Sequence, residues 1–102
     1  MQVTGRVNGD TLYIFLSGEL DEYNAAAARS EADALIERNL CCARAVFDLA
    51  DVHFMDSSGI GFLIGRYKKL KRCAMPAFIR SPDFAADKIL SMSGIYSLIP
   101  KL

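Results

Sequence analysis

The sequence lacks several features that mark common classes of protein. Its 12 basic and 12 acidic residues cancel to a formal net charge of zero, so no overall field draws the chain to nucleic acid or to an anionic membrane surface. No apolar run approaches the roughly 20 residues that a membrane-spanning helix needs. The opening residues, MQVTGRVNGD, do not resemble a secretory signal. We therefore expect a soluble, cytoplasmic protein that binds neither nucleic acid nor membrane.

Cysteine and histidine are also scarce. The three cysteines, Cys41, Cys42 and Cys73, form no CxxC pair, and His53 is the only histidine. Structural zinc sites need about four such side chains at characteristic spacings. We therefore predict a reduced intracellular protein with no metal ion and no cofactor.

Two motifs of catalysis and nucleotide binding are missing as well. The phosphate-binding pattern G-x-x-x-x-G-K-[ST] does not occur, so nucleotide binding is a minor alternative. Ser57, Asp56 and His53 lie close in sequence, but no G-x-S-x-G elbow surrounds the serine. We interpret the chain as a protein without catalytic residues, with a small serine hydrolase as the competing hypothesis.

A chain of 102 residues suits one compact domain with a real core, and no repeats or linker-like tracts divide it. Residues 2–7 and 11–17 are rich in strand formers and flank Asn8-Gly9, which tolerates the positive φ angles of a tight turn. The chain is thus predicted to open with a β-hairpin.

The second strand of this hairpin is apolar on both faces. One face carries Leu12, Ile14 and Leu16, and the other carries Tyr13 and Phe15. We expect this strand to lie inside the sheet with both of its faces covered.

Helical and strand patterns then alternate along the chain. Asn24 and Ser81 are expected to be N-caps, and Pro82 to open the last helix. Phe84, Ala85, Ile89 and Leu90 are expected to face the core. The predicted elements are a helix at 24–38, a strand at 45–49, a helix at 58–71, a strand at 77–79 and a helix at 82–93. This order predicts an α/β fold, with a single mixed sheet of about four strands flanked by α-helices.

A polar cluster, Asp56 to Gly59, separates the 45–49 strand region from the 58–71 helix. Ser57 or Ser58 can cap the helix, and Gly59 permits close approach in its first turn. A well-capped helix is the simplest interpretation. An acid and two adjacent hydroxyls exceed what one cap requires, however, so this helix start is also a candidate functional site.

The helix that follows has an apolar stripe of Ile60, Leu63, Ile64, Tyr67 and Leu70. Phe62 falls on the opposite face and is expected to be exposed and covered by a partner, near Gly65, Arg66 and Lys69. Gly61 and Gly65 are expected to let another segment lie close to the helix. The basic run from Lys68 to Arg72 is interpreted as a solvated helix end.

The motifs on these elements resemble one known family. The stretch FMDSSGIGFLIGRYKKLKR at 54–72, together with GELD at 18–21 and MSG at 92–94, is similar to the signature of STAS-domain anti-sigma factor antagonists. The similarity is especially close to the sporulation sigma-F pathway antagonists of Bacilli and Clostridia, and it extends over nearly the whole chain.

The resemblance implies a phosphorylation-controlled binding protein rather than an enzyme. Such antagonists bind an anti-sigma factor serine kinase with its nucleotide, free the sigma factor, lose activity when the kinase phosphorylates them, and regain it through a serine phosphatase. The phosphorylated residue corresponds to Ser57 here, and the chain is expected to be a monomer. The residues implied around this site, as surroundings or partner contacts, are Asp21, Asp56, Ser58, Gly59, Phe62 and Arg66.

Two further expectations come with the family. STAS domains also serve as scaffold modules in stress-signalling complexes, which is the alternative function. Relatives usually continue into a further strand and helix, so residues 1–102 are expected to form a single STAS domain whose C-terminal strand and helix are short or missing.

Overall fold

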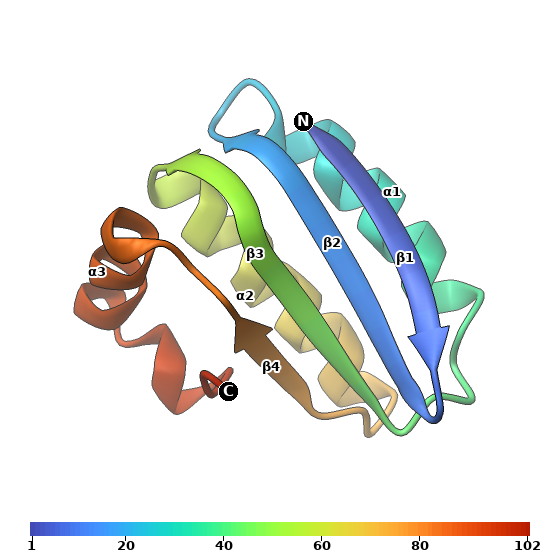
Figure 1. Ribbon diagram of the computed structural model, residues 1–102. Coiled ribbons are helices and arrows are strands. Elements are labelled where there is room, and N and C mark those ends of the chain that lie inside the picture. Colours follow the sequence, from blue (N-terminus) through green and yellow to red (C-terminus); the bar gives the residue numbers. More distant parts are fainter.

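A computed structural model describes all 102 residues and contains one four-stranded sheet (Figure 1). In chain order the elements are β1 (Gln2–Asn8), β2 (Thr11–Leu20), α1 (Ala25–Glu37), β3 (Arg44–Met55), α2 (Ser57–Arg72), β4 (Ala77–Arg80), α3 (Phe84–Ser93) and a short 3-10 helix (Ile95–Ser97). The strand order is β1-β2-β3-β4, with β1 antiparallel to β2 and the other pairs parallel. The predicted fold class is therefore confirmed.

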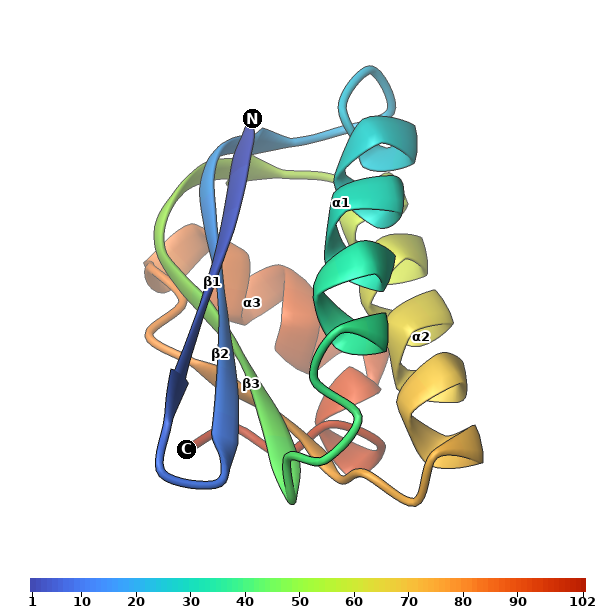
Figure 2. The ribbon, with the colours of Figure 1, turned by 90° about the vertical axis from the view of Figure 1, so that its right-hand side faces the viewer.

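Helices cover the two faces of the sheet unequally. α1 and α2 lie side by side on one face, whereas α3 lies at the side of the sheet next to β3, past the end of the short β4 (Figures 1 and 2). The opposite face of β1 and β2 carries no helix. No helix of the structure combines the length and the apolar character needed to cross a bilayer.

The N-terminal hairpin is present, but its turn lies one residue later than predicted. Asn8 still pairs with Thr11 across the two strands, so the turn residues are Gly9 and Asp10. Gly9 has a φ of +65°, and Asn8 does not have a positive φ. Glycine adopts this conformation without steric cost, which explains why the turn is centred there.

Only one face of β2 is covered by helices, so the prediction that both faces are covered is wrong. Leu12, Ile14 and Leu16 are at most 1% exposed and belong to the core beneath α1 and α2. Tyr13 and Phe15, on the other face, are half-buried. The predicted interior position of β2, between β1 and β3, is confirmed.

Two arginines cover those aromatic rings in place of a helix. The guanidinium carbon of Arg80 lies 4.6 Å from the centroid of the Tyr13 ring, and that of Arg6 lies 5.4 Å from the centroid of Phe15. Arg80 is held by Asp48, whose Oδ2 atom accepts a hydrogen bond from its Nε at 2.7 Å. Cation–π contact thus shields the open face of the sheet.

β3 is much longer than the strand predicted at 45–49. It extends to Met55 in parallel register with β2, so that Leu20 pairs with Met55 where both strands end. Val52 and Met55 are buried, whereas Asp51, His53 and Phe54 are exposed. Because this pattern of burial is irregular, the second half of the strand could not be predicted from the sequence. The strand ends at Met55, directly before the polar cluster.

The start of α3 also differs from the prediction. Asp83 is the N-cap, with its Oδ1 accepting a hydrogen bond from the Ala86 N–H at 2.8 Å, so Ser81 is not the cap and Pro82 does not open the helix. Phe84 lies about 200° around the helix from the buried Ala86, which makes it 87% exposed instead of core-facing.

The other core-facing predictions for α3 have mixed outcomes. Leu90 is buried as predicted, Ile89 is half-buried, and Ala85 is exposed. Gly94 ends the helix with a φ of +78°, so the helix stops at Ser93, where the sequence predicted its last residue.

The end of the chain pairs with β4. The Ile79 N–H donates to the Pro100 carbonyl at 2.9 Å, and the Leu102 N–H donates to the Ile79 carbonyl at 2.8 Å. Lys101 therefore forms an isolated parallel bridge with Ile79, which places the end of the chain next to β4. The Lys101 ammonium also pairs with Asp87 of α3 at 2.9 Å, and Asp87 accepts a hydrogen bond from the Tyr96 hydroxyl at 2.6 Å.

Candidate functional site

Asp56 caps α2, so the prediction that Ser57 or Ser58 is the cap is wrong. Its Oδ1 atom accepts a hydrogen bond from the Ser58 N–H at 2.8 Å, and its backbone is extended. Because β3 runs up to Met55, the acid is the first residue free to turn the chain into the helix. Both serine hydroxyls are thereby released from a capping role.

Ser57 is the first residue of α2, and its side chain is exposed. Its hydroxyl makes no hydrogen bond within the chain. The first turn of this 16-residue helix contains no acidic residue, so its outward N–H groups keep their positive partial charge apart from the Asp56 cap. The structure thus presents a free hydroxyl at the positive end of a long helix.

Asp21 organises the loop between β2 and α1. Its Oδ1 atom accepts hydrogen bonds at 3.0 Å from the backbone N–H groups of Tyr23 and Asn24 and from the Asn24 side-chain amide. Asn24 stands at the predicted N-cap position, but its side chain makes no capping hydrogen bond and instead donates to Asp21 and to the Glu19 carbonyl. This loop is therefore fixed by its own side chains.

The loop of Asp21 begins beside the start of α2. Leu20 pairs with Met55, and its carbonyl accepts a hydrogen bond from the Asp56 N–H at 3.4 Å. Gly59 is buried, and the position that its missing Cβ would occupy is close to Leu20 and Met55. The close approach predicted for Gly59 is thus confirmed, and it joins the GELD and DSSG motifs at one edge of the sheet.

Phe62 is part of the core, and its predicted exposure is wrong. Only 4% of the residue is exposed, and its ring meets that of Phe47 edge-on, with centroids 6.3 Å apart. A partner could reach only the part of this side chain that lines a groove between α1 and α2.

The buried stripe of α2 is rotated from the predicted one because the helix packs against both the sheet and α1. It consists of Gly59, Phe62, Leu63, Arg66 and Leu70. Ile60, Ile64 and Tyr67, which were predicted to be core residues, are half-buried. Leu63 and Leu70 are buried as predicted.

Arg66 is almost fully buried beneath α1. Its side chain is 7% exposed, and its Nε atom lies 2.7 Å from Oδ1 of Asp33. The guanidinium carbon is 5.4 Å from the centre of the Phe62 ring. Burial lowers the pKa of Arg66, Asp33 acts to raise it, and the nearby Arg29 acts to lower it. Sequence reasoning placed this arginine at the surface and did not identify its partner.

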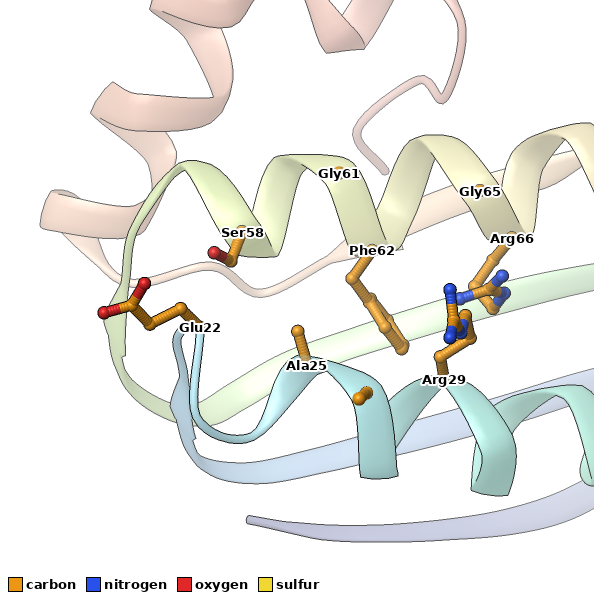
Figure 3. Close-up of a pocket in the computed structure, with 9 residues that line it drawn as sticks. Glu22, Ala25, Arg29, Ser58, Gly61, Phe62, Gly65 and Arg66 are labelled. Carbon is orange, nitrogen blue, oxygen red and sulfur yellow. The ribbon is translucent and has the colours of Figure 1, made fainter.

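A groove of about 350 Å³ runs between α1 and α2 (Figure 3). Ser58 lies at one end, and Arg29 and Arg66 lie together at the other. The residues that line it are Glu22, Ala25, Ala26, Arg29, Ser58, Gly61, Phe62, Gly65 and Arg66. Sequence reasoning missed the α1 side of this groove, although the alanines there and the glycines of α2 are the small residues that leave space between two helices.

Gly61 and Gly65 face this open space. A Cβ at either position would meet no atom within 4 Å, so no other segment of this chain occupies the space that the two glycines were predicted to leave beside the helix. The two glycines instead widen the groove and leave the α2 backbone accessible.

The competing serine-hydrolase hypothesis requires a base that is hydrogen-bonded to the nucleophile. His53 is exposed on β3, and no hydrogen bond joins it to Ser57. Asp56 instead uses its carboxylate to cap α2.

The sequence matches one known family of domains. A family model described as the STAS domain matches residues 2–102. The chain belongs to the STAS domain family. The resemblance inferred from the GELD and DSSG motifs is therefore confirmed, and the STAS domain described here has the four-stranded mixed sheet and N-terminal hairpin expected for it.

Named relatives of this STAS domain cover most of its length. An anti-sigma F factor antagonist of Paenibacillus polymyxa is 31% identical over 100 residues, which are 98% of this chain and 85% of the relative. The anti-sigma factor antagonist SpoIIAA in its unphosphorylated form has a TM-score of 0.80 at 24% identity, over 99% of this chain and 88% of the other. The Bacillus cell fate determinant SpoIIAA in the phosphorylated form has a TM-score of 0.71 at 24% identity, over 99% and 91% of the two chains.

Proposed function

We propose that this STAS domain is an anti-sigma factor antagonist controlled by phosphorylation of Ser57. In its unphosphorylated form it binds an anti-sigma factor serine kinase and frees the sigma factor, and phosphorylation by that kinase ends the interaction. A separate serine phosphatase restores the active form. The observation that carries the proposal is the exposed Ser57 hydroxyl, free of hydrogen bonds, at the start of α2.

The relatives support the antagonist part of this proposal. The Paenibacillus polymyxa relative, which matches almost the full chain, is named an anti-sigma F factor antagonist. Solved structures of SpoIIAA, which share the fold, represent both an unphosphorylated and a phosphorylated form. From the names of these relatives we infer that the domain acts in a sporulation-type pathway in the cytoplasm. We also propose that it acts as a monomer and has no enzymatic activity.

The position of Ser57 suits a switch that acts at the surface. A phosphate adds about −1.5 to −2 charges near neutral pH. At a helix N-terminus this charge is favourable by about 0.3–1 kcal/mol, and the only carboxylate at this helix start is that of the Asp56 cap, which precedes the first turn. We therefore expect the fold to remain unchanged on phosphorylation.

In a partner interface the same phosphate has the opposite effect. An interface that fits a neutral hydroxyl would have to desolvate the new charge beside the carboxylate of Asp56. Each loss of about 1.4 kcal/mol weakens binding tenfold. Release of the partner therefore requires no large conformational change in the STAS domain.

Phosphorylation by the cognate kinase with ATP, followed by mass mapping, tests the proposal. We expect a single phosphate on Ser57, its complete loss in Ser57→Ala, and its retention in Ser58→Ala, which serves as the matched control. A complex that forms but leaves Ser57 unmodified, or that carries the phosphate on Ser58, would contradict it.

A further inference from the structure

We propose that Arg66 and Arg29 form a receptor for a carboxylate side chain of the partner kinase, at the end of the groove opposite Ser58. The inference rests on the proposed function, because the occupant is an acidic residue of that same kinase. It assigns the α1–α2 groove to the interface that contains Ser57.

The first argument is the incomplete hydrogen bonding of Arg66. Its Nε and Nη1 atoms are buried and have no hydrogen-bond acceptor in good geometry. Asp33 forms an ion pair with Nε at 2.7 Å, but this contact is not aligned as a hydrogen bond. Buried polar groups in folded proteins are nearly always hydrogen-bonded. A buried guanidinium that lines a groove and keeps unused donors therefore indicates a missing acceptor.

The second argument is the balance of charge at this end of the groove. Arg29 lies on α1 beside Arg66 (Figure 3) and takes part in none of the five ion pairs of the chain. Asp33 pairs with Arg66, so the positive charge of Arg29 has no paired carboxylate at this end of the groove. An incoming carboxylate would neutralise the excess positive charge, and its two oxygens suit the planar donors of arginine.

The third argument is access from outside. Gly61 and Gly65 leave open space along α2, and Ala25 and Ala26 form the facing wall on α1. A segment of another protein can therefore lie close to the helix backbone. The groove ends at Ser58, next to the residue that the kinase must reach, whereas a free anion would occupy only the arginine end. This continuity favours a protein side chain as the occupant.

Arg29→Glu is the main test, because Arg29 is exposed and its replacement leaves the core intact. We expect the affinity for the kinase to fall by about tenfold or more, as occurs when one member of a close charge pair is changed. Arg38→Glu is the matched control, since it makes the same charge change at an exposed site just beyond the far end of α1, and we expect little effect. Gly61→Leu should also weaken binding, because it fills the groove with uncharged atoms.

Reversal of kinase acids one at a time identifies the occupant. We expect one Asp or Glu changed to Arg in the kinase to restore binding to the Arg29→Glu variant. A saturable shift of the Arg66 Nε–H resonance when inorganic phosphate is added to the free chain would instead assign the site to a free anion and overturn the proposal.

Two negative results have different meanings. Wild-type affinity in both Arg29→Glu and Gly61→Leu would refute the groove interface while leaving the role of Ser57 intact. A wild-type chain that neither binds the kinase nor is phosphorylated would refute the proposed function, and this inference with it.

Discussion

Gly59, in the first turn of α2, lies so close to Leu20, the last residue of β2, that a Cβ atom at Gly59 would be 3.1 Å from the Leu20 carbonyl oxygen and 2.7 Å from the Cγ atom of Met55. Gly61, one half-turn later, has only open space where a Cβ would stand. The same residue type therefore has opposite structural roles two positions apart.

Replacing these two glycines by alanine should change stability in opposite directions. Gly59→Ala is expected to lower the free energy of unfolding by about 1–3 kcal/mol, because the added methyl group overpacks against backbone. Gly61→Ala should raise it by about 0.5–1 kcal/mol through higher helix propensity. Denaturant unfolding of both variants measures the difference, and equal effects would show that the contact between Gly59 and Leu20 is not tight.

The cap of α2 can be assigned by a second pair of variants. Asp56→Ala removes the carboxylate that accepts from the Ser58 N–H and should cost about 0.5–2 kcal/mol of unfolding free energy. Ser58→Ala keeps that N–H and should stay within about 0.5 kcal/mol of the wild type. The opposite ranking in urea unfolding would mean that the serine hydroxyl is the cap.

Ser57→Asp should separate binding from folding. The variant places a negative charge at the N-terminus of α2, where the helix tolerates it, so the thermal midpoint should be nearly unchanged. Binding to the kinase should be strongly weakened, as measured by calorimetry, with Ser57→Asn as the uncharged control of similar size. A variant that is strongly destabilised but still binds tightly would indicate that the charge acts on the fold.

Asp87 should make stability depend on acidic pH. The Tyr96 hydroxyl, and then Lys101, lower the pKa of Asp87 from its ordinary value of 3.8, so the stabilisation is complete above that pH and is lost as the pH falls through the lower folded-state value. Burial, and then Asp87 itself, raise the pKa of Tyr96, so its phenol stays protonated throughout this range.

The comparison of wild type with Tyr96→Phe measures this contribution. The difference in unfolding free energy between wild type and Tyr96→Phe should be constant from about pH 5 to about pH 7. It should become smaller below pH 3.8. Lys88→Ala, on the same helix, is the control and should show no such change. If the difference in unfolding free energy instead increased as the pH fell, Asp87 would not be the titrating group.

Local sequence signals predicted the order of the elements and the place of the site. A continuous run of apolar strand formers after a turn marked β2, helical periodicity marked α1 and α2, and the polar cluster at 56–59 marked the junction of β3 with α2. These features depend on neighbours in the chain, which is why they could be read without the structure.

The errors concern contacts between distant segments. Phe62 was predicted to be on the exposed side of α2 because the helix packs against two elements, the sheet and α1. Helical periodicity alone does not reveal the second of these contacts. The burial of Arg66 depends on Asp33, which lies 33 positions earlier in the chain. The α1–α2 groove could not be predicted for the same reason.

The arginines on the helix-free face of the sheet have a consequence for the shape of the domain. The guanidinium groups of Arg6 and Arg80 lie over the rings of Phe15 and Tyr13, and both arginine side chains remain partly exposed to water. They shield the aromatic rings with a layer that is one side chain thick. A helix in the same place would add its own diameter of about 10 Å to the thickness of the domain. The domain is therefore thin on this side, and this face of its sheet can meet solvent while α1 and α2 cover the other face.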